Sequence, residues 1–159
     1  MLHNKFFWIV MAVMVIGGVG FFIAKKSQGK EQLVQDAISL LKQGDDRSRD
    51  CEAFDKLVEL ASESKAATLM IGEMYARGMC HPFDLDKSID WFKKANLSNE
   101  EIGGALFNAA IWEIPPNDKV GPSREQLISL LAKSKELGFK PSKAELDRIS
   151  PDYAAVFSN

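Results

Sequence analysis

The sequence predicts an all-α protein in which an N-terminal transmembrane helix precedes a short solenoid of α/α hairpins. Three observations support this fold class. Residues 6–24 form an uncharged, almost entirely apolar run. Beyond residue 32, apolar residues recur at helical spacing, and Ser-x-x-Glu or Ser-x-x-Gln signals mark several helix starts. Residues 66–95 are predicted to form two helices that are joined by a polar turn.

The run at residues 6–24 is predicted to anchor the chain in a membrane. At about 1.5 Å per residue, a helix of this length reaches roughly 28 Å, close to the ~30 Å thickness of the hydrocarbon core. Lys5 closes the N-terminal flank at residues 1–5, and Lys25 opens a polar linker at residues 25–32. We therefore expect a single-pass membrane protein.

Cleavage of this segment as a signal peptide is the alternative. Gly18-Val19-Gly20 is a small-x-small triplet that follows an apolar stretch, as in signal-peptidase sites. Phe21, Phe22 and Ile23 prolong the apolar run beyond the triplet, which favours an uncleaved anchor. Cleavage would instead leave a secreted or periplasmic protein.

The charges are divided unevenly along the chain. Four of the 20 basic residues and none of the 22 acidic residues precede residue 31, so the remaining chain carries a formal charge of −6. A mildly acidic domain without a basic cluster argues against nucleic acid as the main partner.

Residues 33–65 are predicted to form a first, divergent hairpin within a helical domain at 33–159. An apolar stripe at helical spacing covers residues 33–41 and stops near Gly44. A polar turn at 44–50 then precedes a second helix over residues 51–62.

The hairpin at residues 66–97 has the strongest pattern. Its turn contains Gly78, and its second helix places Ile89 and Phe92 at helical spacing. Gly72 lies in the middle of the first helix, where a glycine costs about 1 kcal/mol relative to alanine. Close approach of a neighbouring helix is the usual reason for such a glycine.

This hairpin resembles the Sel-one-like repeat family, a subclass of the tetratricopeptide-type (TPR-like) helical repeats. The resemblance rests on Ala67, Ile71, Gly72, Tyr75, Gly78, Asp84 or Asp86, Lys87, Ser88, Trp91, Phe92, Lys94 and Ala95. The turn departs from the family pattern, because Cys80 and His81 stand where a second glycine is common. The match covers one repeat of about 36–44 residues.

The resemblance implies a right-handed stack of hairpins whose first helices line a concave face that holds another protein. Helical spacing from Gly72 and from Ala109 predicts the following partner-binding residues on that face: Leu69, Glu73, Arg77, Leu106, Ala110 and Glu113.

Residues 98–138 are predicted to form a partial repeat, followed by capping helices at 139–159. Capping-box patterns begin at Ser98, Ser123 and Ser142, and Gly138 is expected just after a helix C-terminus. Terminal helices of this kind cover the exposed end of a repeat stack.

Cys51 and Cys80 are predicted to form a disulfide, because each falls at the same end of the stacked helices. The bond would close a loop of about 29 residues and contribute roughly 3–4 kcal/mol. Disulfides persist outside the cytosol, so we expect the domain to face the periplasm from the inner membrane. The lysine count alone favours the opposite orientation, with the domain in the cytoplasm. Two unrelated thiols are the alternative.

No motif in the sequence predicts catalysis, a metal site or a cofactor. His81 is the only histidine after the anchor, and its neighbour Cys80 lacks a third orienting group. Asp84 and Asp86 lack the Gly and Glu spacing of a calcium loop, so one of them is expected to cap a helix. We therefore expect no catalytic residues, no metal ligands and no cofactor.

These patterns lead to one main functional hypothesis, a membrane-anchored, non-catalytic protein-binding module of a bacterial-type cell envelope. One alternative is an immunity or inhibitor protein that neutralises a secreted toxin in the periplasm, by analogy with other small anchored repeat proteins. A third hypothesis is a thiol-redox or metal-handling protein that uses Cys51, Cys80 and His81.

Overall fold

The computed structural model describes residues 29, 31–41, 47–112 and 122–158, and every regular element in these ranges is helical. The all-α prediction is therefore confirmed for this part of the chain. A helix over residues 31–41 precedes the elements α2 (Arg47–Leu60), α3 (Lys65–Arg77), α4 (Leu85–Lys94), α5 (Asn99–Trp112), α6 (Arg124–Glu136), α7 (Lys143–Leu146), α8 (Pro151–Ala154) and η1 (Ala155–Phe157). The predicted anchor at residues 6–24 lies outside the described residues. Within them, no helix combines the length and apolar character that crossing a membrane requires.

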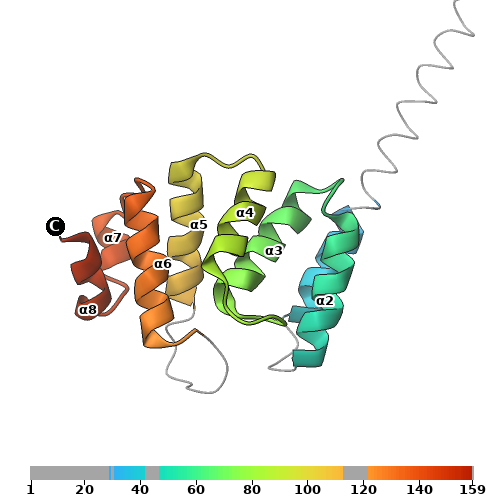
Figure 1. Cartoon of the computed structure of the whole chain (residues 1–159), viewed down its shortest axis with the longest axis horizontal. Coiled ribbons are helices and arrows are strands. Elements are labelled where there is room, and N and C mark those ends of the chain that lie inside the picture. The colour runs from blue at the N-terminus through green and yellow to red at the C-terminus, as the bar shows by residue number, and fades with distance from the viewer. Residues whose placement is uncertain (1–28, 30, 42–46, 113–121, 159) are drawn as a thin grey trace, which may run out of the picture.

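The helices form one row that runs from α2 at one end to α7 and α8 at the other (Figure 1). The most extensive contacts join α3 to α4 and α5 to α6, so each of these pairs forms a helical hairpin. Further contacts join α2 to α3 and α3 to α5. Helix α3 therefore links the N-terminal end of the row to its centre.

Local sequence signals set the helix termini. Ser123 and Ser142 form complete capping boxes, in which the serine hydroxyl accepts a hydrogen bond from the backbone N–H of Gln126 or Glu145 and that residue's side chain accepts one in return. At the other end of α6, Gly138 has φ +91°, the left-handed conformation that glycine adopts without strain. These predicted helix boundaries are confirmed.

Helix α2 begins earlier than predicted. The sequence pattern places its start at residue 51, whereas the structure starts the helix at Arg47. The four extra residues are polar, so they add nothing to the apolar stripe that predicted the helix. They contain no glycine or proline, and Asp50 in the first turn interacts favourably with the positive end of the helix dipole.

Two hydrophobic clusters stabilise the row. The first joins the helix at 31–41, α2 and α3, and includes the buried side chains Val34, Ala37, Phe54, Leu57, Ala67, Ile71 and Met74. The second joins α4, α5 and α6 with the C-terminal elements, and includes the buried side chains Phe92, Ile102, Leu106, Phe107, Leu130 and Leu131. Because Ile71 and Ala76 of α3 belong to different clusters, α3 contributes to both.

Candidate functional site

The first candidate site is the face of α3 that carries Leu69, Glu73 and Arg77. These residues are four positions apart, so they lie one above the other on one side of the helix. The Glu73 carboxylate lies 3.7 Å from the Arg77 guanidinium, and the two side chains remain 32% and 19% exposed. Leu69 packs against the second hydrophobic cluster. The face therefore presents the half-buried pair of opposite charges, with the partly buried Leu69 beside it.

The residues predicted at the same positions of α5 are not on the surface. Leu106 and Ala110 are both 0% exposed and belong to the second hydrophobic cluster. Helix α5 packs against α3, α4 and α6, and neither side chain carries a polar group that would oppose burial. A side chain without exposed area has no surface to offer a partner, so these two residues are core residues. Glu113 lies outside the described residues.

The second candidate site lies at the turn between α3 and α4. The structure joins Cys51 of α2 to Cys80 of this turn in a disulfide, with the two Cα atoms 4.7 Å apart. The predicted pairing is therefore present, and it links two segments that are 29 residues apart in the sequence. A bonded sulfur has no thiolate, so Cys80 is not a nucleophile in this state.

Aromatic rings surround the disulfide turn. The His81 ring lies edge-on to Phe54 of α2 at 4.5 Å between centroids, and it stacks on Tyr75 of α3 at 5.5 Å with 14° between the planes. The ammonium of Lys87 lies 5.4 Å from the centre of the Tyr75 ring. His81 therefore packs against both α2 and α3, and these contacts give its ring a structural role in the turn.

Asp84 and Lys87 form a local charge pair at the start of α4. The Asp84 carboxylate accepts a hydrogen bond of 2.9 Å from the backbone N–H of Lys87, and it lies 3.0 Å from the Lys87 ammonium. The backbone hydrogen bond, followed by the bond to the ammonium, lowers the pKa of Asp84 below its usual 3.8. The pKa of Lys87 is correspondingly raised by its bond to Asp84. The sequence predicted that either Asp84 or Asp86 caps this helix, and in the structure Asp84 is the cap.

A third site was missed by the sequence interpretation. A cavity of about 440 Å³ opens at the C-terminal end of α6, where Lys135, Phe139 and Lys140 meet Phe157 from the end of the chain. The signal that could have indicated it is the stretch KELGFKP at residues 135–141, which mixes basic and apolar residues at the C-terminal end of α6 and directly after it. Phe157 completes the cavity from 16 residues beyond the end of this stretch, which no local pattern could show.

Metal ligands are not gathered anywhere in the ranges that the structure describes: no group of three His, Cys, Asp or Glu side chains there could hold an ion. Comparisons of the chain with known protein families, with curated proteins and with solved structures find no match. The likeness of residues 66–95 to Sel-one-like repeats therefore stays a prediction that rests on the residues quoted above.

Proposed function

We propose that the chain is a non-catalytic protein-binding module that holds one protein partner at a membrane of the cell envelope. The observation that carries the proposal is the half-buried pair of Glu73 and Arg77 on α3. It holds charges of both signs at fixed positions in the central part of the row, and such a pattern can orient a partner with complementary charges. Stacked helical hairpins commonly bind their partners through an extended concave surface.

In this proposal the chain is a single-pass protein of the inner membrane. Residues 6–24 form the anchor, and the helical domain lies in the periplasm. The disulfide between Cys51 and Cys80 supports an oxidising compartment, because thiols in the cytosol are kept reduced. The uncharged apolar run supports the anchor.

The test exchanges the two charges on α3 in the full chain. In E73R/R77E the helix keeps an i,i+4 pair of opposite charges, but in the less favourable order and with a glutamate at the last residue of α3, so we expect its stability to fall by about 1 kcal/mol or less. The charge pattern that faces a partner is reversed, however. We expect affinity purification of the detergent-solubilised chain from its host to recover one protein with the unmodified chain and to lose it with E73R/R77E.

A matched control is available on α6. Lys133 and Glu136 form an ion pair of 2.7 Å on another helix, and K133E/E136K exchanges these charges in the same way. The control should recover the partner unchanged. Equal recovery with E73R/R77E, at unchanged helicity, would contradict binding through α3. A secreted toxin as the recovered partner would favour the immunity function over a scaffold.

A further inference from the structure

The cavity at the C-terminal end of α6 has apolar walls and a cationic lining. It holds about 440 Å³ between the turn at 138–141, α7 and the end of the chain, within the range of small-ligand sites. The side chains that matter here are Lys135, Phe139, Lys140, Pro141, Leu146 and Phe157. None of the residues that line the cavity is acidic.

The ammonium of Lys135 is held at the wall of this cavity. It donates a hydrogen bond of 2.8 Å to the carbonyl of Val156, which ties α6 to the end of the chain. An ammonium has three donors, so two remain for other acceptors. Among the residues that the structure describes, no carboxylate pairs with Lys135 or Lys140. A partly buried cation of this kind is stabilised by a nearby anion.

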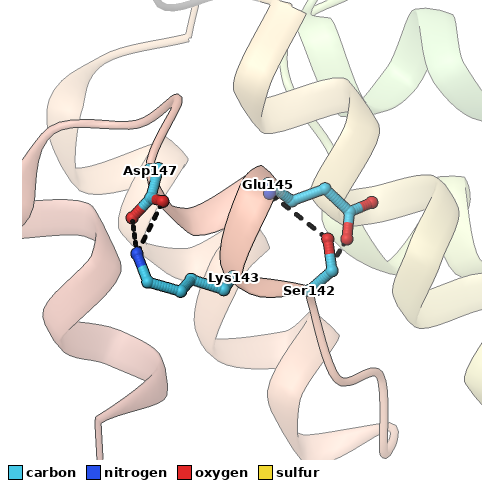
Figure 2. A network of polar contacts seen from close by, with 4 residues as sticks. All are labelled: Ser142, Lys143, Glu145 and Asp147. Carbon is cyan, nitrogen blue, oxygen red and sulfur yellow. Dashed lines mark hydrogen bonds and ion pairs between the residues drawn. The ribbon is translucent and has the colours of Figure 1, made fainter.

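The acidic residues of the same region are already engaged by other groups. Glu136 pairs with Lys133 at 2.7 Å. Figure 2 shows the other two: Glu145 accepts a hydrogen bond of 2.7 Å from the backbone N–H of Ser142, and Asp147 pairs with Lys143 at 2.7 Å. None of these three carboxylates forms an ion pair with Lys135 or Lys140.

The turn that lines the cavity also contains a backbone N–H that is not used in a hydrogen bond within the described residues. The N–H of Phe139 donates to the carbonyl of Ser134 at 3.2 Å, which fixes the turn against α6. The N–H of the next residue, Lys140, has no hydrogen-bond partner within the described ranges. Backbone N–H groups and ammonium groups together form a known mode of binding for the carboxylate at the end of a polypeptide.

We propose that this cavity binds the C-terminal end of a polypeptide whose last residue is apolar. The ammonium groups of Lys135 and Lys140 and the backbone N–H of Lys140 bind the terminal carboxylate. The last side chain packs against the apolar wall formed by Phe139, Leu146 and Phe157. The site is separate from the Glu73–Arg77 face, and it does not depend on the function proposed above.

The test is calorimetric titration of the full-length, detergent-solubilised chain with two short peptides that both end in Leu-Phe. One peptide has a free C-terminal carboxylate, and the other has a C-terminal amide at the same position. We expect the free acid to bind and the amide to bind about tenfold more weakly, because hydrogen bonds to charged groups are the stronger ones. Lys140 is exposed, so K140E should fold normally and lose the binding of the acid.

The control variant is K93E, which makes the same charge change at an exposed lysine on α4. It should leave the affinity for the free acid unchanged. Equal affinities for the acid and the amide, no heat of binding with either, or equal losses in K140E and K93E would overturn the proposal. Octanoate that binds more tightly than the peptide acid would also overturn it, since the site would then select a fatty acid.

Discussion

The ring of Phe92 fills the space in which a side chain at Gly72 would begin. A Cβ atom added to Gly72 would lie 2.7 Å from Cε1 of the Phe92 ring and 2.8 Å from its Cδ1. Phe92 is only 1% exposed, so its ring cannot move out into solvent without opening the core. Close packing of α3 against α4 therefore requires the absence of a side chain at residue 72.

Gly72→Ala should destabilise the domain, although alanine is the better helix former. The gain in helix propensity is about 1 kcal/mol, whereas overpacking a filled core costs about 1–3 kcal/mol. The difference between these two terms predicts that the free energy of unfolding falls by up to about 2 kcal/mol in urea denaturation followed by circular dichroism. The double variant G72A/F92L should recover part of this loss through coupling between the two sites. An unchanged or increased stability of G72A would show that the ring moves freely.

Two adjacent glycines on α5 provide a matched pair of substitutions. A Cβ atom on Gly103 would lie 2.8 Å from the backbone oxygen of Ser134, whereas on Gly104 the nearest atom is Cε2 of the Phe139 ring at 3.2 Å. A backbone oxygen inside a helix cannot yield as a ring edge can. After the gain in helix propensity, we expect Gly103→Ala to cost about 1–2 kcal/mol and Gly104→Ala less than about 1 kcal/mol in the same urea assay. The reverse order would contradict the packing of α5 against α6.

Helix ends were predictable because their signals are local. Ser123, Ser142 and Asp84 each cap a helix through a backbone N–H only three residues further on, so the capping geometry is contained in a tetrapeptide. The close approach at Gly72 was predictable for a similar reason, since a glycine in mid-helix requires a cause. The ring that fills the space beside it comes from Phe92, 20 residues away, and the glycine alone did not identify it.

The surface residues were harder to predict, because exposure depends on neighbours from elsewhere in the chain. Glu73 and Ala110 were assigned to one face from equivalent positions in two helices. The structure leaves the Glu73 side chain 32% exposed and buries Ala110 completely. The cavity beside α6 was missed for the same reason, since Lys135 and Phe157 meet only after the end of the chain folds back.

Asp84→Ala should weaken the start of α4 and remove one acid-sensitive contribution to stability. Loss of an N-cap costs about 1 kcal/mol. The folded-state pKa of Asp84 is below the unfolded value of 3.8. Its contribution is therefore fully present above that pH, and it is lost as the pH falls through the folded pKa.

Asp84→Asn is the control, because asparagine caps helices about as well as aspartate but does not titrate. Urea denaturation between pH 3 and 7 should show that D84N loses less stability on acidification than the unmodified chain. Identical pH profiles for the two proteins would contradict a stabilising role for the ionised cap.

Reduction of the Cys51–Cys80 disulfide should loosen the N-terminal end of the row more than its centre. The bond closes a loop of 29 residues, and removing a constraint of that length costs about 3–4 kcal/mol. The bond joins α2 to the α3–α4 turn. Its reduction therefore removes a covalent constraint on the helices that form the first hydrophobic cluster. Hydrogen exchange should accelerate at Val34, Phe54 and Leu57 well before Leu130 and Leu131 respond. C51S/C80S should show the same exchange pattern and no further response to dithiothreitol. Uniform acceleration across both clusters would instead mean that the row unfolds as one unit.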